Sequence, residues 1–166
     1  MMEQIERELD DIEFRAMELR DIPAICRIER ESFSSPWSAD AFRQELTGNH
    51  FARYTVMVRG GEIIGYGGMW TIMDEAHVTN IAVRGDWRGR GLGSRLLGEL
   101  QRLAVHSGMQ RMTLEVRVSN TLAQHLYKKH GFTPSGLRPG YYSDNHEDAL
   151  IMWAELKPEH GEGTPG

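Results

Sequence analysis

Apolar side chains recur along this chain in two patterns that alternate with each other. In some stretches every second residue is apolar, which indicates a strand that buries one face. In others the apolar residues lie three or four positions apart, which indicates a helix with one buried face. The strands predicted in this way cover residues 14–17, 54–58, 63–72, 76–83, 112–118, 132–137 and 149–156.

Four helices are predicted between these strands, and the sequence marks where several of them start or end. Asp21 and Pro23 mark the start of the first helix, and Asn120 marks the start of the last. Gly108 and Gly131 mark the ends of the third and fourth helices. The four helices are predicted to begin near residues 22, 39, 92 and 121.

The order of these elements predicts a mixed α/β fold in a single domain. The pair Gly60-Gly61 lies between two strands and predicts a hairpin. A strand, a glycine-rich loop, a helix and a strand follow one another over residues 76–118, which predicts a parallel βαβ unit. We expect residues 12–157 to form the domain, residues 1–11 a disordered N-terminal extension and residues 158–166 a disordered tail.

The composition of the chain is that of a globular protein and excludes several functional classes. Its 166 residues carry a formal net charge of -5, 40% of them are hydrophobic, and no apolar run approaches the ~20 residues of a membrane span. Cys26 is the single cysteine, which excludes an internal disulfide and a CxxC site. His125 and His130 lie five positions apart and share no helical face, so we expect no metal site.

The same features lead to expectations about partners and location. The mild acidity of the chain and the lack of interleaved basic and aromatic residues argue against nucleic acid as a partner. The acidic N-terminus lacks the basic and apolar regions of a secretory signal. We therefore expect a cytoplasmic protein that binds neither nucleic acid nor a membrane. A monomer is the expected form, although no sequence feature bears on it.

A glycine-rich loop at the junction of a strand and a helix is the most informative segment of the sequence. It reads Arg88-Gly89-Arg90-Gly91-Leu92-Gly93, and Ser94 follows it. Glycines let the backbone approach a ligand closely, and the first amides of a helix have no internal partners. Because the helix dipole also favours an anion there, the loop could hold a diphosphate through its N–H groups. A tight turn with solvated arginines is the simpler alternative.

Two other phosphate-binding loops compare less well with this segment. A Walker A loop needs Gly-Lys followed by Ser or Thr, which is absent here. A Rossmann loop is approximated by Gly89, Gly91 and Ser94, with Glu115 roughly 20 residues further on as a ribose ligand. However, the loop lies in the middle of the chain, and too few residues follow Glu115 to complete a doubly wound sheet.

The loop resembles the Gln/Arg-x-x-Gly-x-Gly/Ala loop with which the GCN5-related N-acetyltransferases hold the diphosphate of acetyl-CoA. Within that family, the ribosomal-protein-alanine N-acetyltransferases of the RimI type are the most similar. The motifs that carry this second resemblance are Pro36-Trp37-Ser38, the stretch from Leu114 to Asn120, Tyr141-Tyr142, and the stretch from Glu147 to Met152. The resemblance spans about residues 12–156. It implies acetyl transfer to the N-terminal alanine of the eighteenth protein of the small ribosomal subunit.

The resemblance also implies a mixed sheet of six or seven strands, flanked by about four helices, in which the fourth and fifth strands splay apart. In this sequence those strands are residues 76–83 and 112–118. The pantetheine arm of the cofactor would pair with the edge of the fourth strand through backbone groups. The residues implied in cofactor binding are Ile81, Ala82, Val83, Arg88, Gly89, Arg90, Gly91, Leu92, Gly93, Ser94 and Asn120.

Two residues are candidates for the proton transfers that acetylation of an amine requires. Strand alternation places Leu114 and Val116 on one face and Glu115 on the other, where the resemblance implies a general base. A carboxylate is a weak base towards an α-amine with a pKa of about 7.7–8.0. Glu115 would therefore act through a water molecule or with its own pKa raised by burial. Tyr127, on the next helix, is the candidate general acid.

Three aromatic residues in predicted loops are candidates for the acceptor site. Trp37, Tyr141 and Tyr142 could form the walls of a narrow slot that admits a peptide N-terminus. Asp144, Glu147 and Asp148 could attract a positively charged segment, although solvation is the simpler interpretation. Two alternatives stay open: the acceptor is a small amine or another protein, or the chain is a CoA-binding sensor without catalysis.

Overall fold

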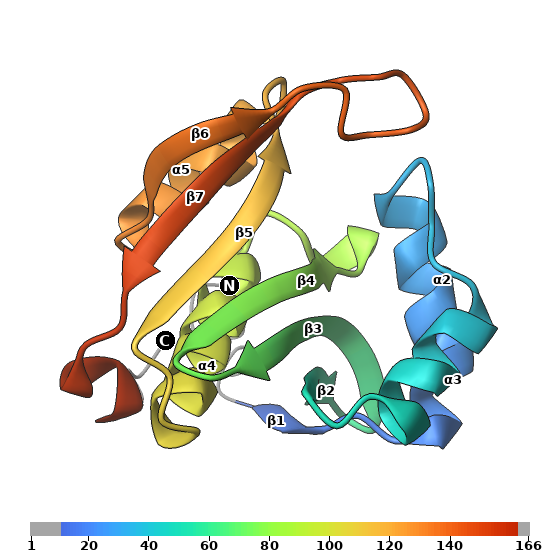
Figure 1. Ribbon diagram of the computed structural model, residues 1–166. Helices are drawn as coiled ribbons and strands as arrows, with labels where there is room; N and C mark the ends of the chain where they lie inside the picture. Colours follow the sequence, from blue (N-terminus) through green and yellow to red (C-terminus); the bar gives the residue numbers. More distant parts are fainter. Residues whose placement is uncertain (1–10, 163–166) are drawn as a thin grey trace.

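The computed structural model describes residues 11–162, in which seven strands form one sheet in the order β1-β2-β3-β4-β5-β7-β6 (Figure 1). Each pair of neighbouring strands is antiparallel, except that β4 and β5 are parallel. The strands are β1 (Ile12–Ala16), β2 (Ala52–Arg59), β3 (Glu62–Ile72), β4 (Glu75–Val83), β5 (Arg111–Arg117), β6 (Thr133–Arg138) and β7 (Ala149–Glu155). The predicted mixed α/β sheet and its hairpin are confirmed.

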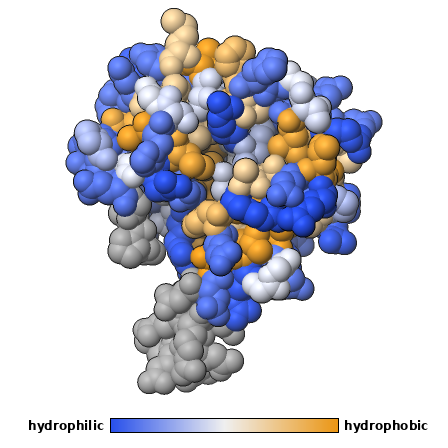
Figure 2. All heavy atoms as spheres, turned by 90° about the horizontal axis from the view of Figure 1, so that it is seen from below, coloured by the Kyte–Doolittle hydropathy of each residue, from blue (hydrophilic) through white to orange (hydrophobic). Residues whose placement is uncertain are grey.

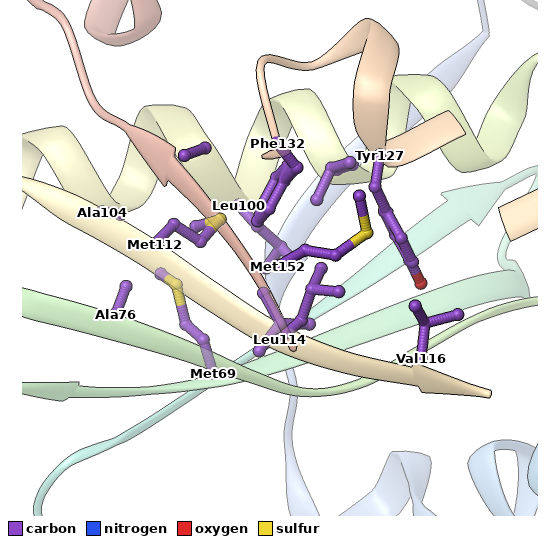
Figure 3. Close-up of a cluster of buried hydrophobic side chains, with 13 residues drawn as sticks. Met69, Ala76, Leu100, Ala104, Met112, Leu114, Val116, Tyr127, Phe132 and Met152 are labelled. Atoms are coloured by element: carbon purple, nitrogen blue, oxygen red, sulfur yellow. The ribbon is translucent and has the colours of Figure 1, made fainter. Parts of the chain in front are cut away.

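Helices cover both faces of this sheet. The helices are α2 (Ile22–Ser32), α3 (Ala39–Gly48), α4 (Leu92–His106) and α5 (Thr121–Lys129), with 3-10 turns η1 (Leu19–Asp21), η2 (Gly85–Trp87) and η3 (Pro158–Glu162). Apolar residues of α2 and α3 pack on side chains such as Tyr66 and Ala82. Apolar residues of α4 and α5 pack on the opposite face, against Met69 and Leu114 (Figures 1 and 3).

The fourth and fifth strands separate soon after they begin. β4 and β5 pair only where Glu75, Ala76 and His77 face Arg111, Met112 and Thr113. Beyond that point β4 continues beside β3, β5 continues beside β7, and the two strands diverge (Figure 1). The predicted splay is therefore confirmed, and it gives both strands an edge that faces the gap.

Two adjacent glycines of β3 let large side chains lie directly on the sheet. A Cβ atom on Gly67 would lie 2.9 Å from Leu100 Cδ1 of α4 on one face. A Cβ atom on Gly68 would lie 2.1 Å from the ring of Tyr54 on the other face. The Tyr54 ring therefore lies across Gly68, and its hydroxyl reaches the Thr79 hydroxyl on β4 at 3.0 Å.

The end of the described chain differs from the sequence-based prediction of a disordered tail. Residues 158–162 form η3, which lies against α4. His106 of α4 donates a hydrogen bond to the carbonyl oxygen of Gly161 (2.8 Å), and Gly161 also packs on Val105. These contacts order the segment, which its composition did not predict. Residues 163–166 and residues 1–10 of the expected N-terminal extension lie outside the described residues.

The surface seen in Figure 2 shows apolar side chains in small groups separated by hydrophilic ones. Among the helices of residues 11–162, none combines the length and the apolar content that a membrane crossing requires.

Candidate active site

A cavity of about 560 Å³ opens where β4 and β5 separate. Its walls come from both strands, from the segment between α2 and α3, from α5 and from the loop after β6. Seven residues expected from the sequence to belong to the site line it: Trp37, Ile81, Glu115, Asn120, Tyr127, Tyr141 and Tyr142. The cavity is also lined by Glu29, Trp70, His77, Asn80 and Arg117, for which the sequence suggested no role.

Glu115 projects from β5 towards the face of the sheet that carries α2 and α3. Its neighbours Leu114 and Val116 point into the core on the other face, as strand alternation predicts. The Glu115 side chain is only 9% exposed. His77 Nε2 lies 2.6 Å from one carboxylate oxygen of Glu115, and Arg138 Nε lies 3.4 Å from the other.

These neighbours determine the protonation state of Glu115. Burial raises the pKa of Glu115, but the hydrogen bond and charge of His77, together with the charge of Arg138, lower it by more. The net pKa therefore lies below the usual value, and the side chain is an ionised carboxylate at neutral pH. The sequence left two routes open for Glu115: action through a water molecule, or a pKa raised by burial. The second is wrong.

Tyr127 lies on the other side of the gap between the strands. Asn120 accepts a hydrogen bond from the Ala123 N–H (3.1 Å) and thereby caps α5, the helix that carries Tyr127. The Tyr127 ring packs 5.8 Å from Phe132, and its hydroxyl points past Val116 (Figure 3). Burial raises the pKa of Tyr127 to about 12, with a smaller contribution from Tyr142, so that the hydroxyl is protonated at neutral pH.

A β-bulge in β4 forms the polar floor of the cavity. Asn80 lies opposite Gly68 and Val78 lies opposite Met69, which leaves Thr79 between them without a partner on β3. Val78 faces α4, whereas Asn80 faces α2 because of the extra residue.

Glu29 of α2 is the centre of that floor and is 1% exposed. Its carboxylate accepts hydrogen bonds from the Tyr66 hydroxyl, from the Trp37 backbone N–H (2.9 Å) and from the Asn80 amide (3.4 Å). The Asn80 carbonyl oxygen is buried and has no hydrogen-bond partner among the described residues.

The free edge of β4 presents alternate backbone groups to the gap. The Arg84 N–H bonds to the Ile64 carbonyl on β3 (2.8 Å), so that groups of Ala82 also face β3 while those of Ile81 and Val83 face the gap. Of the three residues expected to bind the cofactor here, Ala82 therefore points away, and its side chain is buried towards α2. The Val83 carbonyl oxygen already accepts a bond from Arg88 Nε (3.0 Å).

The glycine-rich loop has the backbone conformation that anion binding at a helix start requires. Gly89 and Gly91 both have φ of 78°, and a Cβ on either would meet no atom within 4 Å. Gly91 directly precedes α4, whose first N–H groups lack partners within the helix. An open, glycine-lined helix N-terminus of this kind fits a diphosphate.

The side chains of the loop, unlike its backbone groups, are engaged in contacts within the protein. The Arg90 guanidinium lies 4.5 Å above the Trp87 ring, and Arg88 reaches the Ser32 hydroxyl at 2.8 Å. Leu92 is buried in the core, and the Ser94 hydroxyl lies 2.7 Å from His130 Nε2. Backbone groups rather than these side chains therefore face the open side of the loop.

Arg117 holds the loop between β6 and β7 over the mouth of the cavity. Its guanidinium pairs with Asp144 at 2.9 Å and Glu147 at 3.2 Å, and it lies 3.9 Å above the Tyr142 ring. Hydrogen bonds from Ser119, together with Arg117, lower the pKa of Glu147 to about 2. These acidic side chains, which the sequence offered as an attraction for a positive segment, are thus engaged within the protein.

Comparison with known proteins places this arrangement in a family. The sequence profile of the acetyltransferase (GNAT) family matches residues 22–132. The chain belongs to this family. The GNAT resemblance expected from the glycine-rich loop is thereby confirmed.

Individual GNAT relatives are similar over nearly the whole domain. A Bacillus subtilis protein provisionally named ribosomal protein bS18-alanine N-acetyltransferase is 47% identical over 142 residues, which cover 86% of this chain and 94% of the relative. An Escherichia coli K12 protein named ribosomal protein bS18-alanine N-acetyltransferase is 34% identical over 139 residues, 82% of this chain and 93% of the relative. The crystal structure of the Escherichia coli ribosomal-protein-S18-alanine N-acetyltransferase superimposes with a TM-score of 0.81 at 31% identity, covering 88% and 94% of the two chains.

Two further observations concern the chemistry available to this GNAT domain. Within residues 11–162, no group of three or more His, Cys, Asp and Glu side chains is placed to hold a metal ion.

The position of His77 next to Glu115 depends on the pairing of β4 with β5, which lie far apart in the sequence. Alternation along the strand shows only which face His77 occupies, so local patterns could not reveal this contact.

Proposed function

We propose that this protein transfers the acetyl group of acetyl-CoA to the N-terminal α-amine of a protein, with the N-terminal alanine of ribosomal protein bS18 as the acceptor. Family membership and the names of the Bacillus subtilis and Escherichia coli relatives support this proposal. The observation that carries it is the cavity in which Glu115 and Tyr127 approach from opposite faces of the splayed strands. An acceptor of this kind would be modified in the cytoplasm.

The cofactor site proposed here uses mainly the backbone. N–H groups from Gly89 to Ser94 bind the diphosphate, and Arg88 and Arg90 add positive charge near it. Backbone groups of Ile81 and Val83 pair with the pantetheine arm along the free edge of β4. Acetyl-CoA supplies the acetyl group as a reactive thioester. Asn120 lines the same cavity as Tyr127.

The proposed chemistry assigns one proton transfer to each side of the gap. Glu115 removes a proton from the acceptor amine, which is already partly neutral at pH 7 because the pKa of an α-amine is about 7.7–8.0. A bridging water suits this step, because the pKa of Glu115 is low. Tyr127 keeps its proton at neutral pH and donates its hydroxyl hydrogen to the leaving sulfur.

The acceptor enters from the side of the sheet that carries α2 and α3. Trp37, Tyr141 and Tyr142 form the walls of the entrance, and the Arg117 ion pairs hold the two tyrosines in place.

The test is acetyl transfer from labelled acetyl-CoA to a peptide with the N-terminal sequence of bS18, followed by mass spectrometry of the product. The same peptide with a blocked N-terminus is the control. We expect one acetyl group on the free peptide and none on the control. Transfer to small amines only, or binding of CoA without transfer to any amine, would refute the proposal in favour of one of the alternatives.

Substitution of the two residues tests their roles. We expect Glu115→Gln and Tyr127→Phe each to lower kcat by about 10²–10⁴-fold, the range of general acid–base catalysis. Titration calorimetry should show that acetyl-CoA still binds to both variants. Full activity of either variant would remove that residue from the mechanism.

A further inference from the structure

Acetylation of an amine releases a proton that has to leave the site in every turnover. The acceptor nitrogen begins as R–NH3+ and ends as an amide N–H, so it gives up two protons as its bond to the acetyl carbon forms. The C–S bond breaks with both electrons on sulfur, which takes the Tyr127 hydroxyl proton to become a thiol. One of the two amine protons replaces it on Tyr127. The other proton passes to solvent, which restores the charge of the site.

Glu115 is poorly placed to deliver that proton to solvent. Its side chain is 9% exposed, and the bound acceptor would fill the cavity in front of it. His77 is the contact through which a proton can leave. Its Nε2 lies 2.6 Å from Glu115 Oε2, and its own side chain is 33% exposed.

We propose that His77 relays the proton from Glu115 to solvent, an inference that rests on the proposed function. Glu115 takes the proton from the acceptor amine, directly or through water, and passes it from Oε2 to His77 Nε2. The ring that accepts is the neutral tautomer with its hydrogen on Nδ1, so that Nε2 has a lone pair for the proton. The imidazolium formed in this way loses its Nδ1 proton to water, and the hydrogen left on Nε2 then donates to the Glu115 carboxylate. Exchange with water in the emptied cavity restores the first tautomer before the next turnover. An imidazole suits this role because it can take up a proton on one ring nitrogen and release one from the other.

The other charged and titratable groups around this pair favour release of the proton. Arg138 of β6 lies 3.4 Å from Glu115 Oε1, so a positive charge on His77 has a second cation close to it. Tyr141, on the loop after β6, interacts electrostatically with Glu115. Trp70 contacts the His77 ring edge-on at 6.0 Å, and its indole N–H is bound to Glu45 of α3. Trp70 thereby fixes the position of the ring next to Glu115.

The experiment compares three variants with the wild-type protein in steady-state acetylation of an alanine-terminated peptide between pH 6 and pH 9. His77→Gln keeps a side-chain N–H towards Glu115 but cannot carry a proton. His77→Ala opens a space that free imidazole can occupy. His125→Gln removes an exposed histidine on α5 and is the matched control.

We expect His77→Gln to lower kcat by about tenfold or more, with KM for acetyl-CoA unchanged within about twofold. The loss should be largest at low pH, where more protons have to be removed from the acceptor. Added imidazole should raise kcat of His77→Ala in proportion to its concentration, which a merely structural role of His77 would not produce. His125→Gln should have wild-type kinetics.

Two results would overturn the relay and leave the proposed function intact: wild-type kcat in His77→Gln, or no response of His77→Ala to imidazole. Acetyl-CoA binding to each variant, measured by calorimetry, establishes that the variants are folded. If the wild-type protein itself transferred no acetyl group to the peptide, the proposed function and the relay would both fall.

Discussion

Gly68 is a position at which one added methyl group should disrupt both the fold and the floor of the cavity. A Cβ atom there would lie 2.1, 2.5 and 2.6 Å from three carbons of the Tyr54 ring, whereas carbon atoms normally pack at about 3.5–4.0 Å. The ring is 6% exposed and meets Phe42 edge-on at 6.3 Å, so it has little room to move.

The expected cost of Gly68→Ala follows from these contacts. Overpacking costs about 1–3 kcal/mol, and loss of the Tyr54–Thr79 hydrogen bond adds about 1 kcal/mol. The free energy of unfolding should therefore fall by about 2–4 kcal/mol. For a domain of this size that corresponds to a decrease in Tm of about 4–16 °C.

Urea titration followed by tryptophan fluorescence measures this change, and Gly136→Ala is the matched control. Gly136 also lies in a strand, but the nearest atom to its added Cβ, Ile151 Cδ1, is 3.9 Å away. Alanine there should be neutral or slightly stabilising, because glycine is unfavourable in a strand. The decisive comparison introduces Gly68→Ala into a Tyr54→Leu background, where the ring is absent. An equal cost in both backgrounds would refute the clash as its cause.

Two further predictions concern the active-site loops. Gly91→Ala places alanine at a φ of 78°, which costs about 1–2 kcal/mol. The empty loop can relax to relieve this strain and must regain the φ to hold the diphosphate, so calorimetry should show acetyl-CoA affinity about 5–30-fold weaker. Gly98→Ala on the same helix should leave the affinity unchanged. The pKa of Glu147 is lowered from 4.5 to about 2, so its stabilising effect is complete above pH 4.5 and is lost as the pH falls towards 2. Glu147→Gln should therefore lower Tm at pH 7 and have progressively less effect below pH 4.5. A decrease in Tm of the same size at every pH would contradict this explanation.

The sequence predicted the elements well where periodicity was local. The strands and helices end within about two residues of their predicted bounds, because alternation and capping residues such as Asn120 act over short distances. The splay of β4 and β5 came from the family resemblance, since no local pattern determines where two strands stop pairing. The tail was mispredicted at residues 158–162 because its order depends on contacts with α4.

The sequence predicted the candidate site only in part, because local patterns do not show the contacts between strands that are distant in the sequence. The cavity brings together Glu115, Tyr127 and the three aromatic residues expected to bind the acceptor. Of the two routes left open for Glu115, the pKa raised by burial was wrong, because the partners from β4 and β6 that lower this pKa were not foreseen. Ala82 was included by its position in the motif, although alternation alone would have separated it from Ile81 and Val83.

Because Thr79 has no partner on β3, the numbering of the side chains that face the acceptor side changes from odd to even along β4. Before Thr79, odd-numbered side chains such as His77 point to the acceptor side; after it, even-numbered ones such as Asn80 and Ala82 do. Deleting Thr79 would leave these orientations unchanged, because Val78 and Asn80 already lie opposite the adjacent residues Met69 and Gly68 and would then simply alternate. The extra residue therefore adds the Thr79 side chain to the lining of the cavity without changing which side chains the rest of β4 turns towards it.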